Sequence, residues 1–231
     1  MQKTLISSIL IVGMAAASTA AIAESEPPEI SLEGLELVEK DRQGEIYADP
    51  GIDWSIYDKI QLDNATVAFR KNWKRNQNRQ MTFKVKDSDM ENIKANLSEL
   101  FDTVFREELT TKGNFEMTTE SGENVMRITP RIVDLDVYAP DTRTVGNTMT
   151  FTDSAGRMTL KLEIYDSTTG DLIATASDRR EAPRHGYYQW TTRVSNNAEA
   201  RRMLQRWAKD LRIRLEKART TSAAADQSIS E

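Results

Sequence analysis

The stretch RMTLKLEIYDSTTGDLIATAS, residues 157–177, has the pattern of a β-hairpin. Apolar residues alternate from Met158 to Ile164, and this spacing places them on one face of a strand. The Thr-Thr-Gly sequence ending at Gly170 follows, and glycine supplies the left-handed backbone that a tight hairpin turn requires. Leu172–Ser177 is the predicted partner strand.

Further strands are predicted upstream of this hairpin. Residues 124–138 alternate well with apolar side chains on both faces, as in a central strand, and Pro130 inside them predicts a bulge or kink. Residues 58–70 alternate more loosely and predict the first strand. Residues 143–156 predict a long loop, in which 149–152 could extend a strand.

Two helices are predicted. Residues 89–112 place apolar side chains at a 3–4 spacing, with Ser88 and Glu91 as a capping box and Gly113 as a left-handed C-terminal cap. The last helix is capped by Asn196 or Asn197 and carries a buried stripe that includes Leu204, Trp207 and Leu211. Its other side is strongly charged, which is typical of a solvated face.

The predicted element order is strand, helix, strand, strand, strand, helix. This order favours an α+β fold, a single domain in which two helices pack on one antiparallel sheet. A doubly wound sheet is the alternative, but strands and helices alternate too rarely for it. We expect the domain to span 46–219, between a flexible tether at 24–45 and a disordered tail at 220–231.

The N-terminus has the pattern of a cleavable signal peptide over residues 1–23. Lys3 provides the positive start, residues 5–17 are almost entirely apolar or small, and Ala21-Ile22-Ala23 fits the small-x-small cleavage pattern. The apolar run is shorter than the roughly 20 residues of a membrane span. We therefore expect a periplasmic protein without an integral membrane anchor after cleavage, which could still be peripheral to a membrane.

Composition narrows the possible chemistry. The 231 residues include no cysteine and one histidine, so thiol nucleophiles and thiolate metal sites are excluded. No glycine-rich phosphate-binding motif occurs, and we expect no cofactor. The net charge of −5 gives no sign of a nucleic-acid partner.

The sequence of residues 126–182 is similar to that of a known protein family. The segments that show the similarity are MRITPRIVDLD at 126–136, APD at 139–141, SAG at 154–156, EIYDSTTG at 163–170 and DRR at 178–180. They resemble the bacterial envelope family named domain of unknown function 3313, many of whose members look like lipoproteins. The resemblance implies an exported α/β domain, and it brings no assigned catalytic residues to this chain. This chain has Glu24, not a lipid-bearing cysteine, after the predicted cleavage site, which favours a free periplasmic form.

Acidic residues and the lone histidine are the candidates for catalysis. Asp134 and Asp136 lie two apart on one predicted strand face and could act as an acid–base pair, or Asp134 could pair with an arginine across the sheet. A second set of acids, Asp166, Asp171 and Asp178, is expected to cluster at the hairpin. Within it, Asp166 is most simply an Asx-turn residue, and Asp178 could pair with an arginine across the sheet. His185 lacks the surrounding motif of a catalytic triad. Structural roles are favoured throughout, and no metal site is expected.

The sharpest electrostatic feature is a basic run. Residues 70–86 contain seven cations, no acid, and an interleaved Trp73. Together with the aromatic loop at 183–190 they form the predicted interaction surface: Arg70, Lys71, Trp73, Lys74, Arg75, Arg79, His185, Tyr187, Tyr188 and Trp190. The plain alternative is a solvated, flexible connection between a strand and a helix.

These observations favour a non-catalytic periplasmic module for binding or envelope assembly. Its partner would be an envelope protein or an anionic envelope surface such as lipid, lipopolysaccharide or peptidoglycan. Two alternatives stay open: a carboxylate-dependent periplasmic hydrolase, and a structural homo-oligomer subunit that associates through the last helix.

Overall fold

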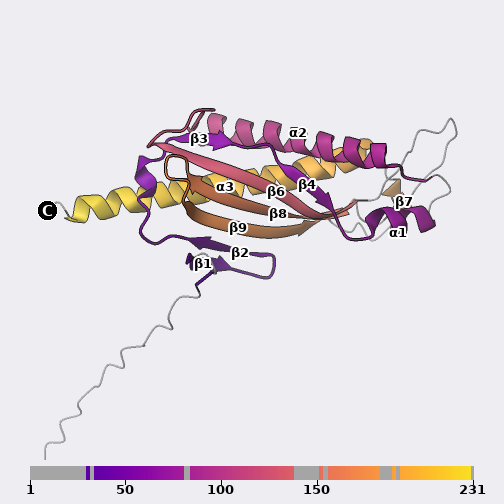
Figure 1. The fold of residues 1–231 in the computed structure, drawn as a ribbon, viewed down its shortest axis with the longest axis horizontal. Coiled ribbons are helices and arrows are strands. Elements are labelled where there is room, and N and C mark those ends of the chain that lie inside the picture. Colours follow the sequence, from indigo (N-terminus) through magenta and orange to yellow (C-terminus); the bar gives the residue numbers. More distant parts are fainter. Residues whose placement is uncertain are drawn as a thin grey trace, which may run out of the picture.

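The computed structural model describes residues 30–31, 34–80, 84–137, 151–152, 156–182, 189–190 and 193–229. Within them three helices accompany an eight-stranded mixed sheet, and the single α+β domain is confirmed (Figure 1). The sheet order is β1-β2-β9-β8-β6-β3-β5, with β4 also paired to β6. The strands are β1 (Glu36–Lys40), β2 (Gly44–Ala48), β3 (Lys59–Leu62), β4 (Thr66–Phe69), β5 (Glu116–Met117), β6 (Val125–Val137), β8 (Gly156–Asp166) and β9 (Leu172–Glu181).

The β8–β9 hairpin is confirmed. Its strands pair antiparallel, and Gly170 takes the expected left-handed backbone at φ +77°. Oδ1 of Asp166 accepts hydrogen bonds from the backbone N–H groups of Thr168 and Thr169, each at 2.8 Å, so Asp166 is the Asx-turn residue that its position indicates. β9 continues to Glu181, beyond the predicted end at Ser177.

The sheet is mixed, and the prediction of an antiparallel sheet is wrong in this respect. β6 pairs antiparallel with β8 but parallel with both β3 and β4. The reason is the helix α2 (Asp87–Thr111), because a helical crossover returns the chain to its starting end and the next strand then runs parallel. The strand predicted over 58–70 is two strands, interrupted at residues 63–65.

β6 matches the strand predicted at 124–138, but its irregularity lies elsewhere. Pro130 pairs regularly with Leu162 of β8, so the bulge predicted there is wrong. Pro130 lies opposite the break between β3 and β4, where no strand pairs with that side of β6. The register shifts instead between Val133 and Asp136, where Asp134 has a left-handed backbone with φ 52°.

The core lies between one face of the sheet and the long helices α2 and α3 (Arg193–Ile229). Figure 1 shows both helices running along the sheet. Inward side chains of β6 and β8 meet the buried stripes of the helices, where Phe101 and Phe105 stack with ring centroids 3.9 Å apart. The opposite face of β6 presents exposed Arg127 and Arg131, so only one face is apolar.

The ends of α2 differ from the predicted caps. The helix begins after Lys86, whose N–H donates to the carboxylate of Asp89 at 2.8 Å, so Asp89 rather than Glu91 caps the start. At the other end the left-handed residue is Asn114, with φ 53°, rather than Gly113. Gly113 is required for space, because a Cβ there would lie 2.7 Å from the carbonyl oxygen of Leu109.

Both ends of the domain are more ordered than predicted. Residues 36–40 of the expected tether form β1, which pairs with β2 at the sheet edge. α3 starts before Asn196 and runs through most of the expected tail to Ile229, beyond the end of the sheet (Figure 1). The hydroxyl of Ser222 accepts the N–H of Trp54 in the short helix η1 (Trp54–Ile56) at 3.1 Å, which docks this end of α3.

The predicted signal peptide at 1–23 lies outside the described residues, as does most of the loop predicted at 143–156. Phe151–Thr152 form the strand β7, which pairs with β10 (Gln189–Trp190). Among the described residues, no helix combines the length and apolar character needed to cross a membrane.

Candidate functional site

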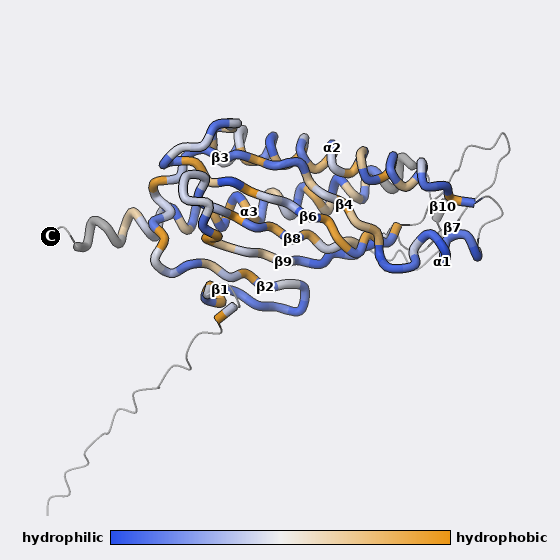
Figure 2. The backbone as a smooth tube through the Cα atoms, viewed as in Figure 1, coloured by the Kyte–Doolittle hydropathy of each residue, from blue (hydrophilic) through white to orange (hydrophobic). Residues whose placement is uncertain are grey.

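Part of the basic run, residues 73–80, forms a helix, where a flexible connection was the alternative. The helix is α1 (Trp73–Gln80), which lies at one end of the molecule and is hydrophilic along its length (Figures 1 and 2). Asn72, with φ 63°, turns the chain into it, and the N–H of Trp73 donates to the carbonyl of Arg70 at 3.0 Å. Asn78 ties the helix to the following segment, because its Oδ1 accepts the N–H of Val85 at 2.7 Å.

Trp73 is an anchor and not part of an exposed surface, which corrects its place among the predicted interaction residues. Its side chain is 1% exposed, and it stacks on Phe69 with ring centroids 4.2 Å apart. Its Nε1–H donates to the carbonyl of Val137 at 2.8 Å. Trp73 and Val85 form a small cluster of their own, so α1 is held to the sheet by a packed indole with a satisfied polar edge.

Three cations of the run are bonded within the protein. Arg70 forms an ion pair with Asp136 at 3.3 Å, and Lys74 forms one with Asp87 at 2.6 Å. The ammonium group of Lys84 donates to the carbonyl of Asn78. These three side chains help to fix α1 against β6 and α2.

The other four cations of the run, Lys71, Arg75, Arg79 and Lys86, are exposed and have no carboxylate partner among the described residues. Lys86 lies at the start of α2, and the other three lie in α1 or just before it. Arg75 and Arg79 are one helical turn apart and lie on the face opposite to Trp73 and Gln77, since a two-residue offset rotates a side chain by about 200°. α1 is thus divided into a buried face and a cationic face. We call Lys71, Arg75 and Arg79 the outer cationic face of α1.

Of the aromatic part of the predicted surface, the structure describes only the backbone of Trp190. His185, Tyr187 and Tyr188 lie outside the described residues. Trp190 belongs to β10, where it pairs with Phe151 of β7. The β7–β10 pair lies at the same end of the molecule as α1 (Figure 2).

The predicted carboxylate pairs do not form acid–base dyads. Asp136 makes ion pairs with Arg70 and Arg157, at 3.3 and 3.1 Å, while the backbone irregularity of β6 at Asp134 separates the two acids. Among the described residues, Asp134 has no ion pair. Asp178 lies in the hairpin, well along β9 and opposite Leu160, so it does not cluster with Asp166 and Asp171 at the turn.

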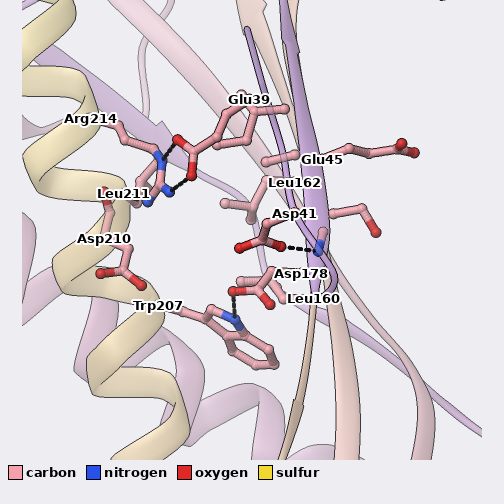
Figure 3. Close-up of a pocket in the computed structure, with 14 residues that line it drawn as sticks. Glu39, Asp41, Glu45, Leu160, Leu162, Asp178, Trp207, Asp210, Leu211 and Arg214 are labelled. Carbon is pink, nitrogen blue, oxygen red and sulfur yellow. Dashed lines mark hydrogen bonds and ion pairs between the residues drawn. The ribbon is translucent and has the colours of Figure 1, made fainter. Parts of the chain in front are cut away.

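The sequence did not indicate a cavity that the structure shows between the β1–β2 hairpin, the sheet and α3 (Figure 3). Its volume is about 80 Å³, which is room for several waters because each needs about 10–15 Å³. Leu160, Leu162 and Leu211 give it apolar walls. Trp207, Asp210, Leu211 and Arg214 face it from α3 at a helical i, i+3, i+4, i+7 spacing.

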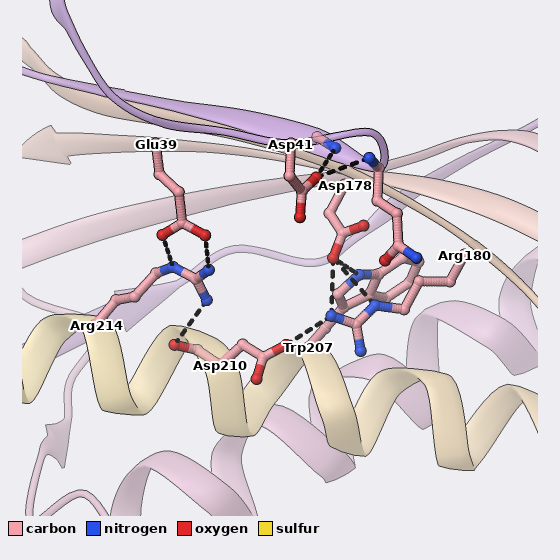
Figure 4. A network of polar contacts seen from close by, with 9 residues as sticks. Glu39, Asp41, Asp178, Arg180, Trp207, Asp210 and Arg214 are labelled. Carbon is pink, nitrogen blue, oxygen red and sulfur yellow. Dashed lines mark hydrogen bonds and ion pairs between the residues drawn. The ribbon is translucent and has the colours of Figure 1, made fainter.

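A polar network borders this cavity (Figure 4). Oδ2 of Asp178 accepts hydrogen bonds from Arg180, at 2.8 and 3.0 Å, and from Nε1–H of Trp207 at 2.9 Å. Arg180 also binds Asp210 at 2.6 Å and lies over the ring of Trp207, 5.6 Å from its centroid. Oδ1 of Asp178 is buried without a hydrogen-bond partner. The network fastens α3 to β9.

The hairpin side of the cavity has two further charged groups. Arg214 of α3 binds both carboxylate oxygens of Glu39, at 2.7 and 3.3 Å, and this hydrogen bonding raises the pKa of Arg214. Asp41 accepts the backbone N–H groups of Gln43 and Gly44, at 2.7 and 2.8 Å, and these bonds lower the pKa of Asp41. No group of three or more potential metal ligands occurs among the described residues.

The sequence contains the helical spacing of the residues on α3 that form this network, but it does not show that they share one face. The predicted buried stripe of the last helix contains Trp207 and Leu211 but not the charged residues Asp210 and Arg214. All four lie on one stripe of α3 that faces the sheet edge. Their partners on β1 and β9 are separated from them by at least 27 residues of sequence, and the chain in between gives no hint of the register.

The family model for the protein of unknown function DUF3313 matches residues 25–211. The chain belongs to the DUF3313 family. No curated protein is a significant match. The resemblance seen at residues 126–182 therefore extends over most of the chain.

Several solved structures resemble this DUF3313 protein weakly. A PelC dodecamer from Paraburkholderia phytofirmans is 9% identical, with coverage of 73% of this chain and 97% of that chain and a TM-score of 0.36. A DUF330 protein from Xanthomonas campestris is 11% identical, with coverage of 80% and 94% and a TM-score of 0.34. A minor lipoprotein from Acinetobacter baumannii is 18% identical, with coverage of 74% and 96% and a TM-score of 0.27. At these values no function carries over to this chain.

Proposed function

We propose that this DUF3313 protein is a non-catalytic binding module of the periplasm, and that it binds an anionic envelope partner through the outer cationic face of α1. The proposal rests mainly on one observation: α1 has a buried face and an opposite cationic face. Its inner face is fixed by Trp73, while Lys71, Arg75 and Arg79 are exposed without a carboxylate partner among the described residues. Cations held at fixed positions and not neutralised by their own protein are available to an anionic ligand.

The contrast with the neighbouring cations supports a role beyond solubility. Arg70, Lys74 and Lys84 are used to attach α1 to the rest of the domain. Lys71, Arg75 and Arg79, by contrast, form no ion pair with a described residue. The packed indole of Trp73 holds the helix backbone in place, so binding through the outer face does not have to order the backbone of α1 as well.

The hydrolase alternative has less support from the geometry. Asp136, its central candidate, is held in ion pairs by two arginines, which suits a structural role better than proton transfer. Asp178 is likewise engaged by Arg180 and Trp207. No observation favours a carboxylate pair poised for catalysis.

Binding to a soluble polyanion tests the proposal. The probe is fluorescein-labelled heparin, followed by fluorescence anisotropy at 50 mM NaCl. The test variant is Lys71→Gln/Arg75→Gln/Arg79→Gln. The matched control is Arg201→Gln/Arg206→Gln/Lys209→Gln, which removes three exposed cations from the outer side of α3 and makes the same change in net charge.

The α1 variant is expected to bind at least tenfold more weakly than the wild type, and the α3 variant within about threefold. Both variants alter exposed side chains, so their circular dichroism and melting curves should match the wild type. Equal losses in the two variants would show that only total charge matters. That result, or unchanged binding by the α1 variant, would overturn the proposal.

A further inference from the structure

We infer, on the basis of the proposed function, that the anionic partner is the surface of an anionic phospholipid bilayer, on which the molecule docks end-on through α1. α1 lies at one end of the long axis of the molecule (Figure 1). The outer cationic face lies on the side of α1 opposite to the buried Trp73, so it points away from the part of the sheet on which Trp73 packs. The phosphate group of the lipid is the chemical target.

The shape of the site favours a plane over a threaded chain. Arg75 and Arg79 project from one convex side of a two-turn helix, with Lys71 just before it. A peptide or glycan strand is recognised in a groove that surrounds it. The cavity described above lies between β1, β9 and α3, at a different place from α1.

The distribution of charge favours one orientation. Residues 70–86 carry seven cations and no acid. Because the whole chain is at −5 and this run contributes +7, the other residues together carry −12. The run is thus far more cationic than the chain as a whole, and a negatively charged surface attracts it. Asp136 and Asp87 pair with Arg70 and Lys74, so Lys71, Arg75 and Arg79 contribute most to this attraction.

The size of the effect is measurable. A cation close to an anionic bilayer strengthens binding by about fivefold at moderate ionic strength. Three such cations together strengthen it on the order of a hundredfold. The interaction is screened within about 10 Å at 0.1 M salt, so it should depend steeply on ionic strength.

The experiment is co-sedimentation of the protein, purified as the cell produces it, with two kinds of vesicle. One kind is pure phosphatidylcholine, and the other contains 40 mol% phosphatidylglycerol. The Lys71/Arg75/Arg79→Gln variant and the α3 control variant described above are compared with the wild type at 50 and 500 mM NaCl. Inorganic phosphate at 10 mM serves as a competitor that offers the same group without a surface.

The expected result is salt-sensitive binding to the phosphatidylglycerol vesicles, at least thirtyfold weaker in the α1 variant and within threefold in the control. Inorganic phosphate should not compete effectively. Wild-type binding that is equal on both kinds of vesicle, or full binding by the α1 variant, would overturn the inference. If heparin binds through α1 but the vesicles do not, only the bilayer assignment fails; if neither binds, the proposed function fails as well.

The orientation has its own test, because a chain without cysteine allows single labels. Ser88→Cys places a fluorophore at the exposed start of α2, next to α1, where Lys74 and Asp87 are in contact. Thr221→Cys places one on the far part of α3. Energy transfer to a headgroup-labelled lipid should be stronger from position 88. Equal transfer from both positions would contradict end-on docking.

Discussion

Single residues decide which part of α1 can meet a ligand. Trp73 belongs to a basic stretch, and its composition suggested an exposed aromatic among cations. The indole instead fills the junction between α1 and the sheet, where Phe69 and the carbonyl of Val137 receive it. These partners come from β4 and β6, and only the assembled sheet brings them together. Sequence reasoning found the charged stretch but could not divide it into an anchored side and a free side.

Glu108 shows the same dependence on tertiary partners. It is 8% exposed on α2, where its carboxylate binds Arg212 of α3 at 3.0 Å and Lys112 at 2.7 Å. Burial acts to raise the pKa of Glu108, but the hydrogen bonds from Lys112 and Arg212 outweigh it, and the pKa lies below its ordinary value of 4.5. The ion pair thereby links the two long helices.

Replacing Glu108 with glutamine should lower the free energy of unfolding by about 2 kcal/mol near neutral pH, because Arg212 loses a buried partner. A carboxyl group whose pKa is lowered in the folded state stabilises the protein above its unfolded pKa, and this contribution disappears as the pH falls through the folded pKa. The difference from wild type should therefore be constant above about pH 5.5 and shrink below 4.5.

Urea unfolding between pH 3 and pH 7 measures this difference. Glu107→Gln is the matched control, since Glu107 is the neighbouring residue on the exposed side of the same helix and should show almost no effect. A difference between Glu108→Gln and wild type that grows on acidification would contradict the account.

At the scale of elements, local sequence pattern located most strands and helices but did not predict how the strands pair with one another. The β8–β9 hairpin, β6 and α2 were predictable because each is specified by side-chain period and turn residues within its own segment. The parallel pairing of β3 and β4 with β6 depends on how α2 crosses over, which no local period records. The β1–β2 hairpin escaped prediction because β1 is short and mostly exposed, so its alternation is weak.

Gly44 explains how the β1–β2 hairpin attaches to the sheet. β2 pairs with β9 from Gly44 opposite Asp178, and a Cβ at Gly44 would lie 1.8 Å from the carbonyl oxygen of Ser177. A side chain at this point cannot be accommodated unless the two strands move apart. The contact also places Asp41 and Glu39 of the hairpin near α3.

Gly44→Ala should therefore destabilise the domain by about 3 kcal/mol or more, since two backbones must separate. Gly51→Ala is the control, because its nearest contact would be a side-chain oxygen of Asp49 at 3.3 Å and its φ is not in the left-handed region. Thermal unfolding of the two variants compares them directly. Similar melting temperatures would show that the hairpin adjusts freely at Gly44.

At the scale of the whole molecule, the charge of the basic run contrasts with the net charge of the chain. The chain is at −5, although residues 70–86 contain seven cations and no acid, and this local excess is the physical basis of the proposed function. The total charge could be read from the composition, and the basic run from the sequence. That the run forms a helix at one end, with its outer face free, required the fold.

Arginine footprinting tests the claim that the outer face of α1 meets the partner. The protein is treated with phenylglyoxal in the presence and absence of phosphatidylglycerol vesicles, and modification is quantified by mass spectrometry. Arg75 and Arg79 should become at least fivefold less reactive on binding, while Arg201 and Arg206 on α3 keep their reactivity. Unchanged reactivity at Arg75 and Arg79 under conditions where the protein is bound would contradict the account.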